Sequence, residues 1–487
     1  MRVLYIDVDS LRPDHLGAHG YERPTSPTID ALAERSTVME QTYSSSSPCG
    51  PSRGCLMSGV FGIRHGVLTH WGPGSRFRFP GQAHTYFRDA PTLTRHLREN
   101  GVSTVSFSSF MDRHQMFWFG AGWSQMNTFT LKQGDEDADE VNAAVIPWLR
   151  EKIRTTPDLF LHVQYWEPHR NYTMPERWAR EVEHAPIPSW LTPERVAAHR
   201  ESAAPYSPQE LFPGRRREDA PTPSMPRRID DLEDAHRFFD GYDGAVRYLD
   251  DQIGMLLHEL DLLGVLEDTA IILSADHGEA LGEQSVYGDH TSAANAVHHV
   301  PMIVHWPGAP AHRQQGLTYQ LDMDATICDL LGVPVPEGWD SRSFAPAVRG
   351  ESGWSGRDQL VWDHGLYCAQ RVVRTPQWLY QRTYHPGVFE HRPTSLYDAE
   401  DVHQIDDVAD AHPGTVAELE EELVAWRREQ LARTDLPDPL DEILAGGGPY
   451  RYVQLEQWMR LLGEHGRESE ARRLRAHIEA TARTCVA

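Results

Sequence analysis

The chain is 487 residues long and 40% hydrophobic, which is enough to bury a large core and to hold one big domain plus a smaller one. Its formal net charge of −25 argues against nucleic acid, anionic membrane surfaces and a polyanionic substrate held by broad electrostatics, although local basic residues can still bind a small anion. The five cysteines are odd in number and scattered, so they predict no disulfide framework, and no apolar run approaches membrane-spanning length.

The first predicted element is a strand over residues 3–8, a nearly continuous apolar run typical of a parallel strand that is buried on both faces. The chain begins without the charged and apolar regions of a secretory signal, so we expect a cytoplasmic protein. Asp7 lies inside the run and Asp9 closes it. Open α/β sheets bind ligands at the carboxyl ends of their strands, so Asp9 is expected at a ligand-binding edge. A capped amphipathic helix is predicted next, over residues 26–35.

A run of serines then leads through Pro48 to Cys49, which we expect on a loop. Pro51 presets the backbone of a first helical turn, so a helix is predicted from about Pro51. The sulfur of Cys49 would then lie against unpaired N–H groups at the positive end of a helix dipole, and its thiol is expected to have a lowered pKa. Arg53 in the same turn can bind an oxyanion through its planar guanidinium.

Helices and strands alternate over the next part of the chain, as they do around a parallel sheet. Helices are predicted over residues 92–100 and 141–152, and strands over residues 102–108 and 159–165.

Basic side chains follow both of these strands. Arg113 and His114 come after the first, where the alternative is a polar surface loop, and His169 comes after the second. A histidine directly after a strand is well placed at the sheet edge to serve as an acid or base, although a single histidine is more often structural.

Residues 186–228 break this pattern, because they are rich in proline and have little periodicity. A loop of this length usually has a function or is disordered, and we interpret it as an excursion near the mouth of the site or at a contact with another subunit. A helix over residues 244–263 and a buried strand over residues 270–275 are predicted after it.

A second cluster of polar residues, Asp276-His277-Gly278, closes that strand. Two adjacent residues can both reach one ion only if the backbone turns there, and Gly278 permits a turn. Carboxylate ligands suit Ca²⁺ or Mg²⁺, although imidazole is less typical for either ion.

The last part of the chain contains smaller elements. A helix is predicted over residues 322–331 and an antiparallel sheet within residues 359–384. After Pro413 the chain is helical and highly charged, with a break at three consecutive glycines, residues 446–448. We interpret this tail as a packing element or as an oligomer contact.

Two of these motifs, with several weaker ones in the right order, resemble the type I, formylglycine-dependent sulfatase family of the alkaline phosphatase-like superfamily. The motifs read Cys49-x-Pro51-Ser52-Arg53-x-x-x-Met57-Ser58-Gly59 and Ser274-Ala275-Asp276-His277-Gly278. The resemblance covers about residues 2–408 and implies an α/β fold with a mostly parallel central sheet flanked by helices. The implied catalytic domain covers residues 1–358 and has an irregular insert at about residues 186–228. A small antiparallel C-terminal subdomain follows at residues 359–411, and a helical extension at residues 412–487.

In this family the cysteine that matches Cys49 is oxidised to formylglycine, whose hydrated aldehyde is the nucleophile. The resemblance implies one divalent ion, Ca²⁺ in first place with Mg²⁺ and Mn²⁺ as alternatives, held by Asp9, Cys49, Asp276 and His277.

The resemblance also implies roles for the remaining site residues. Arg53, Arg113 and His290 would offset charge on the sulfate oxygens, and His169 would protonate the leaving alcohol. His114 would help the second hydroxyl of the hydrated aldehyde to expel sulfate.

The chain departs from the family pattern at two positions. A second aspartate often follows the position of Asp9, but here it is Ser10, so either Asp7 or Ser10 could complete the metal site. Many relatives have a lysine before the residue that matches His290, but here it is Asp289, which leaves His290 as the available cation.

The predicted function is hydrolysis of a small sulfate monoester, with a carbohydrate or aryl alcohol released. A phosphonate monoester or phosphodiester hydrolase fits the same motifs, and a third reading is a non-catalytic binder in which Cys49 stays unmodified. A formylglycine-generating maturation enzyme is the implied partner, with a homo-oligomer through the C-terminal helices as a further expectation. Specificity is expected in the loops over residues 65–88 and 186–228, and residues 114–119 suggest an aromatic substrate face or a core cluster.

Overall fold

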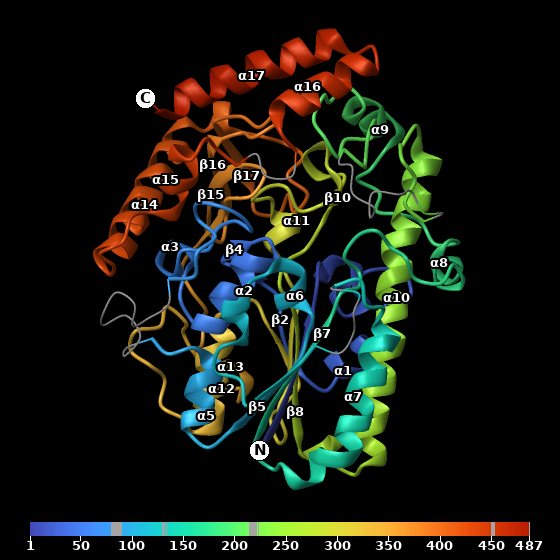
Figure 1. Ribbon diagram of the computed structural model, residues 1–487, viewed down its shortest axis with the longest axis vertical. Coiled ribbons are helices and arrows are strands. Elements are labelled where there is room, and N and C mark those ends of the chain that lie inside the picture. Colours follow the sequence, from blue (N-terminus) through green and yellow to red (C-terminus); the bar gives the residue numbers. More distant parts are fainter. Residues whose placement is uncertain are drawn as a thin grey trace.

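An eight-stranded sheet runs through the larger part of the molecule in the order β12-β2-β11-β8-β1-β7-β5-β6 (Figure 1). The computed structural model describes residues 1–78, 90–128, 132, 134–213, 222, 224–449 and 453–486, with side chains up to residue 481. The strands of this sheet are β1 (Arg2–Val8), β2 (Thr37–Met39), β5 (Ser103–Phe107), β6 (Gln125–Asn127), β7 (Leu159–Tyr165), β8 (Thr269–Ala275), β11 (Met302–His305) and β12 (His312–Gln314).

The centre of the sheet is parallel. β1 pairs in parallel with both β7 and β8, and β7 pairs in parallel with β5, whereas β11 is antiparallel to β8. β7 and β8 are buried along their whole length, and β1 is buried beyond Arg2, which explains their apolar sequences. The four strands predicted in this part of the chain are therefore confirmed, to within a residue at each end. Their carboxyl ends meet at one edge, which positions the residues that follow them.

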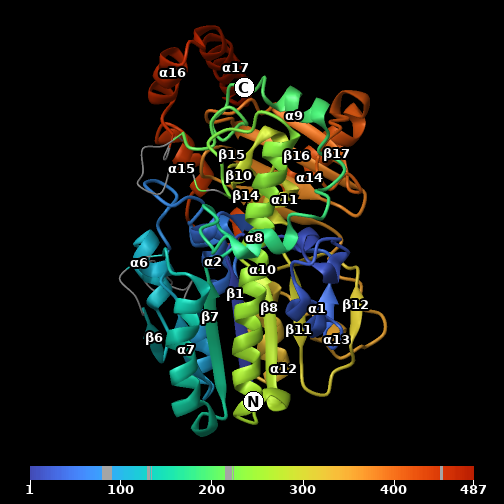
Figure 2. The ribbon, with the colours of Figure 1, turned by 90° about the vertical axis from the view of Figure 1, so that its right-hand side faces the viewer.

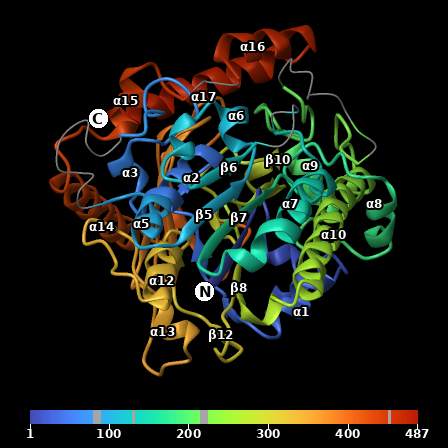
Figure 3. The same ribbon diagram turned by 60° about the horizontal axis from the view of Figure 1, so that its bottom comes forward.

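Helices cover both faces of the sheet (Figure 3). α1, α7 and α10 pack on one face and α5, α12 and α13 on the other, around two separate apolar cores. Within the described ranges, every helix is too short or too polar to cross a lipid bilayer. The helices are α1 (Pro27–Ala33), α2 (Cys49–Ser58), α3 (Gly62–His65), α5 (Leu93–Glu99), α6 (Phe110–His114), α7 (Ala138–Lys152), α8 (Arg177–Val182), α9 (Pro193–His199), α10 (Leu232–Leu262), α11 (Asn295–His298), α12 (Asp322–Leu331), α13 (Ala345–Val348), α14 (Pro413–Ala432), α15 (Pro439–Ala445), α16 (Leu455–Glu464) and α17 (Glu468–Val486).

Helix α10 is longer than its apolar stripe predicts. It begins at Leu232, where the side chain of Asp231 accepts a hydrogen bond from the backbone of Asp234 and caps the first turn. Buried aromatic residues such as Phe238 and Tyr242 continue the stripe toward the amino end. The prediction of a start near residue 244 was wrong because it followed the aliphatic positions alone.

A second sheet has the order β17-β16-β15-β14-β4 and lies beyond the carboxyl edge of the first (Figure 2). β4 comes from the segment just before Cys49 and pairs in parallel with β14, so the strand leading into the site belongs to the C-terminal sheet. The domain boundaries remain a prediction. The pairing of β4 with β14 joins the predicted catalytic domain to the predicted C-terminal subdomain. The strands are β4 (Ser46–Ser47), β14 (Leu360–His364), β15 (Ala369–Arg374), β16 (Trp378–His385) and β17 (Thr394–Asp398), and two small ribbons pair β3 (Thr42–Tyr43) with β13 (Thr318–Tyr319) and β9 (Ala280–Leu281) with β10 (Tyr287–Asp289).

The C-terminal helices pack on the chain itself. α14 covers the second sheet, and α16 packs against the excursion that the sequence places at residues 186–228. There the indole N–H of the buried Trp458 donates to the carbonyl of Ala203 at 2.9 Å. The excursion contains helix α9, and its residues 214–221 and 223 lie outside the described residues. Residues 79–89, which include the last part of the other predicted specificity loop, also lie outside them.

We expect Trp458→Ala to lower the free energy of unfolding by about 3–5 kcal/mol, because it empties a fully buried site and removes the hydrogen bond to Ala203. Urea unfolding followed by circular dichroism measures this change. Val424→Ala is the matched control, since Val424 is 46% exposed on α14. Equal, small losses in both variants would show that α16 does not stabilise the excursion.

Candidate active site

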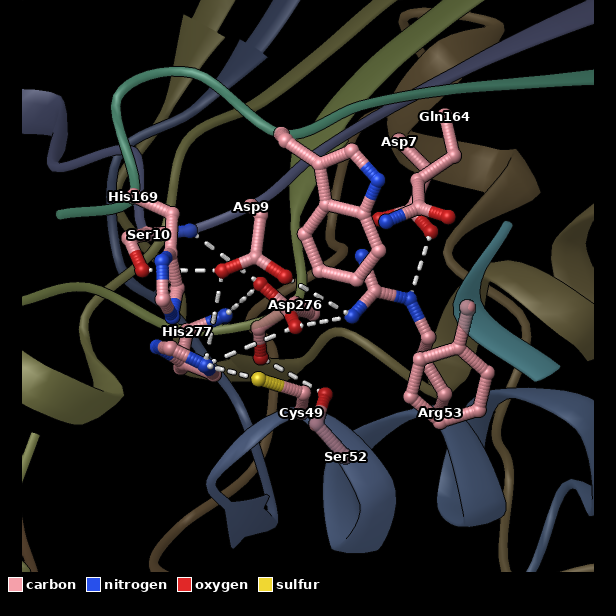
Figure 4. Close-up of polar contacts among 12 residues, drawn as sticks. Asp7, Asp9, Ser10, Cys49, Ser52, Arg53, Gln164, His169, Asp276 and His277 are labelled. Atoms are coloured by element: carbon pink, nitrogen blue, oxygen red, sulfur yellow. Dashed lines mark hydrogen bonds and ion pairs between the residues drawn. The ribbon is translucent and has the colours of Figure 1, made fainter. Parts of the chain in front are cut away.

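Four side chains meet at the carboxyl ends of β1 and β8 (Figure 4). Asp9 follows β1, Asp276 and His277 follow β8, and Cys49 is the first residue of α2. Each is fully buried, and one donor atom from each lies within 4.8 Å of the other three. β1 and β8 are adjacent and parallel, so the residues that close them are brought together by the sheet itself.

The ring of His277 is oriented by its own backbone. Its Nδ1 lies 2.8 Å from the carbonyl oxygen of Gly278. A carbonyl can only accept, so Nδ1 carries the proton and Nε2 keeps its lone pair. Nε2 lies 3.2 Å from Sγ of Cys49 and 3.5 Å from Oδ2 of Asp276, so the lone pair faces the other donors.

Gly278 is required for a different reason from the one that the sequence suggests. Its φ is not positive, so the turn does not depend on left-handed backbone. Instead its N–H donates to the carbonyl of Val297 at 2.8 Å, and a Cβ at this position would lie 2.1 Å from the carbonyl oxygen of Ala296. The glycine therefore permits close packing of two backbone segments beside His277.

Arg53 lies at the centre of three buried carboxylates. Its Nε donates to Asp7 at 3.0 Å, and its Nη1 donates to Asp9 at 3.1 Å and also to Asp276. Asp7 accepts a further contact at 3.1 Å from the ring of His162, so it lies behind Arg53 and outside the four converging donors.

Ser10 is also placed by these contacts. Its hydroxyl donates to Oδ1 of Asp9 at 2.9 Å, and its N–H donates to Oδ1 of Asp276 at 3.3 Å. Ser10 therefore orients the two carboxylates in the position where relatives often supply a second aspartate.

The charge of this cluster suits a divalent cation. Asp7, Asp9 and Asp276 together carry three negative charges when ionised, against the single positive charge of Arg53. Buried charge of one sign is strongly unfavourable unless it is paired, and a doubly charged ion would balance the two negative charges that remain. Burial, assisted by the nearby carboxylates of Asp9 and Asp7, raises the pKa of Asp276, as expected for a carboxylate that lacks a full counter-charge. The donor set of carboxylate oxygens with one imidazole fits such an ion.

The thiol of Cys49 does not have the lowered pKa that its place at a helix N-terminus predicts. Burial raises the pKa of Cys49, and the carboxylates of Asp9 and Asp276 raise it further. The prediction was wrong because the nearby negative charges and the loss of solvent outweigh the helix dipole. Without a bound cation, an unmodified thiol is therefore a poor nucleophile in this site.

Two further predicted histidines lie beside this cluster. The ring of His290 is 4.4 Å from that of His277 and 5.6 Å from that of His169, measured between centroids. Burial lowers the pKa of His169 to about 3, and the pKa of His290 is also lowered by burial, so both rings are neutral before substrate binds. The buried ring of His290 is therefore not the cation that the sequence suggests.

Arg113 and His114 lie at the end of α6. The ring of His114 is buried, 4.5 Å from the ring of His70, and burial lowers its pKa. The guanidinium of Arg113 lies 4.9 Å over the ring of Trp166 and donates to the carbonyl of Gly134. His70 was not predicted, because it lies on an irregular loop, yet its Nε2 accepts a hydrogen bond from the N–H of Gly50 at 3.2 Å.

A buried ion pair connects the neighbours of His169 and His290, and the sequence did not reveal it. Nη1 of Arg170 donates to Oδ2 of Asp289 at 2.9 Å, and both side chains are at most 10% exposed. Arg170 also donates to the carbonyl of Leu211 in the excursion, at 2.8 Å. The carboxylate that replaces the lysine of many relatives is therefore paired with Arg170.

Buried carboxylates and a potential nucleophile at the carboxyl edge of a mostly parallel sheet are typical of a hydrolase. A sequence model of the family described as Sulfatase matches residues 2–333. The chain thus belongs to the sulfatase family.

Two named sulfatases are similar to this chain in sequence, and one solved structure is similar to it in fold. The chain is 27% identical to human iduronate 2-sulfatase over 347 residues, which cover 64% of this chain and 60% of that protein, less than two thirds of its length. It is 24% identical to the choline-sulfatase of Rhizobium meliloti over 403 residues, 73% of each protein. The phosphonate monoester hydrolase of Agrobacterium radiobacter superposes with a TM-score of 0.69 at 21% identity, over 88% of this chain and 96% of that one, which shows the shared fold.

We expect Asp289→Asn to lower the free energy of unfolding by about 3–5 kcal/mol, because it leaves the guanidinium of Arg170 buried without its partner charge. Arg392→Gln is the matched control, since it removes ion pairs with Asp407 and Asp410 whose arginine is 45% exposed, and should cost about 1 kcal/mol or less. Urea unfolding of both variants measures the difference. If Asp289→Asn costs no more than the control, the pair does not fix the two histidine segments.

Proposed function

We propose that this protein hydrolyses sulfate monoesters, releasing sulfate and an alcohol, with a formylglycine made from Cys49 as the nucleophile. The observation that carries the proposal is the position of Cys49 at the start of α2, with its side chain within 4.8 Å of donor atoms from Asp9, Asp276 and His277. A reacting group at this place would be next to a bound cation and against the N–H groups of a helix.

The carboxylates of Asp9 and Asp276, Nε2 of His277 and the side chain at position 49 would hold a divalent ion. We propose Ca²⁺, with Mg²⁺ and Mn²⁺ as alternatives, since carboxylate oxygens dominate the donors. When bound, the ion supplies Lewis-acid polarisation of the sulfate ester and of the nucleophile.

Formylglycine at position 49 can complete a catalytic cycle that a thiol cannot complete. Attack by sulfur on a sulfate ester would leave an adduct that has no internal route to break down. The hydrated aldehyde has two hydroxyls on one carbon, so one can attack sulfur and the other can expel sulfate.

The surrounding side chains orient the ligands, stabilise charge and transfer protons. Arg53 fixes the orientation of Asp9 and Asp276 through its hydrogen bonds, and so acts on the sulfate mainly through its charge. We propose that Arg113 and His290 stabilise charge on the sulfate oxygens. His169 is neutral before substrate arrives, and the negative charge of a bound ester would favour its protonated form, which can then donate a proton to the leaving oxygen. We propose that His114, which is buried beside His70, accepts a proton when sulfate is expelled.

The cellular setting remains part of the proposal. A formylglycine-generating enzyme must act on Cys49, and we propose that the protein works in the cytoplasm, because the cysteines with described side chains form no disulfide. Assembly of copies through the C-terminal helices stays a prediction. The alcohol that is released is proposed to be a carbohydrate or an aryl group.

The alternative is hydrolysis of a phosphonate monoester or phosphodiester in the same site, because such an ester is also tetrahedral and singly charged. Relative turnover of a nitrophenyl sulfate and a nitrophenyl phosphodiester distinguishes the two. We expect the sulfate to be the better substrate and chelation with EDTA to abolish its turnover, with recovery after Ca²⁺ is added. A phosphodiester rate that exceeds the sulfate rate would favour the alternative, and full turnover after chelation and dialysis would remove the metal from the reaction.

We expect His169→Ala to slow alkyl or sugar sulfates by about 100-fold or more while affecting nitrophenyl sulfate much less, because a basic leaving oxygen depends most on general acid catalysis. The values of kcat for both substrates give the comparison. His258→Ala, on the exposed side of α10, is the control and should change neither rate. Equal losses on both substrates would show that His169 is not the acid.

A further inference from the structure

A second set of donors meets at Cys49, and it differs in chemistry from the carboxylate set. Cys49, His169 and His290 each offer one donor atom, and these atoms lie within 4.8 Å of one another. The set has one sulfur and two imidazole nitrogens and no carboxylate. Thiolate with imidazole is the donor combination that zinc-type ions prefer, whereas Ca²⁺ and Mg²⁺ prefer oxygen.

Hydrogen bonds already prepare the ring of His169 for a metal. Its Nδ1 donates to the carbonyl of Arg170 at 2.7 Å, so in the neutral ring Nε2 keeps a free lone pair. Histidines that bind zinc almost always donate their other ring N–H to a carbonyl or carboxylate in this way.

The ring of His290 has an unused nitrogen. Its Nδ1 is buried and has no hydrogen-bond partner within the described part of the chain, and the residue is only 6% exposed. A buried polar atom without a partner is costly, and coordination would satisfy it.

The backbone segments that carry the two rings are tied together before any ion binds. Asp289 accepts a hydrogen bond from the N–H of His290 at 2.8 Å and forms the buried ion pair with Arg170, which follows His169. An ion that binds here therefore has little ordering cost, since the segments are already positioned.

The carboxylate set is less suited to the same ion while Cys49 is a thiol. Arg53 donates to both Asp9 and Asp276, so one oxygen of each carboxylate is already engaged with a positive charge. Within the described residues, Nδ1 of His290 has no hydrogen-bond partner and lies 4.0 Å from Oδ1 of Asp289, and the hydrogen bond of His169 to Arg170 uses Nδ1 and not Nε2.

We propose that the unconverted, thiol form of this protein binds one zinc-type divalent ion through Sγ of Cys49 and the rings of His169 and His290. Binding forms a metal–sulfur bond and releases the thiol proton to solvent, with no change of oxidation state. Conversion of Cys49 removes the sulfur and dismantles the site. The ion would coordinate two histidines that the proposed reaction needs. Unconverted protein with this ion bound would therefore not bind esters, whereas converted protein would.

The test uses full-length protein made without the maturation enzyme and saturated with Ca²⁺, titrated with Co²⁺ as a spectroscopic substitute for zinc. We expect one Co²⁺ per chain, with a thiolate-to-cobalt charge-transfer band in the near ultraviolet that Zn²⁺ abolishes. Cys49→Ser should lose the band, and His169→Asn and His290→Asn should each weaken Co²⁺ binding by about tenfold or more.

Two variants serve as matched controls and should keep the band. Cys55→Ser removes the other cysteine of α2, whose sulfur lies 3.2 Å from Nε2 of His65 in a comparable cysteine–histidine contact. Asp276→Asn alters the carboxylate set alone. A further arm needs no substitution, because converted protein should show no band and should bind Zn²⁺ at least about tenfold more weakly than the thiol form.

Two results would overturn the proposal. One is the absence of the charge-transfer band in the wild-type thiol form. The other is a band that survives in both histidine variants but disappears in Asp276→Asn, which would put the ion in the carboxylate set. Neither result depends on turnover, so a protein without sulfatase activity would count against the proposed function and leave this inference standing.

Discussion

The excess of buried negative charge at the carboxyl edge of the sheet is the constraint on which the rest of the site depends. Three carboxylates, from Asp7 in β1, Asp9 just after it and Asp276 just after β8, face a single guanidinium, that of Arg53. Solvent cannot compensate this charge, because all four side chains are fully buried. A divalent cation would complete the electrostatic balance of the site, and in its absence burial and the same charges raise the pKa of the Cys49 thiol.

The fold supplies this arrangement through elements that are distant in sequence. The parallel pairing of β1 and β8 brings Asp9 next to Asp276, and α2 places Cys49 and Arg53 over the same edge. β4, which leads into α2, is a strand of the C-terminal sheet, so that sheet fixes the entry of the helix. Arg170, which follows His169, donates a hydrogen bond to the excursion, and the excursion packs in turn against α16. The outer parts of the molecule thus support the geometry of a small buried centre.

The sequence predicts well which side chains converge, because Asp9, Asp276 and His277 each close a strongly patterned strand. It places Cys49 on a loop before a helix from about Pro51, whereas the helix begins at Cys49 itself. It predicts less about how they interact. The pair between Arg170 and Asp289 joins residues 119 positions apart, and nothing local indicates it. β4 has two residues and no readable pattern. The shift in the pKa of Cys49 depends on charges that converge only in three dimensions, so local sequence favours the opposite direction.

Mass spectrometry of the peptide that contains Cys49, combined with the specific activity of the same preparation, tests the central claim most directly. We expect the aldehyde in active preparations, with aryl sulfate turnover that rises in proportion to the converted fraction when the maturation enzyme is co-produced at different levels. Cys49→Ala should show neither the aldehyde nor turnover. Full activity from a preparation in which Cys49 is present only as the thiol would contradict the account.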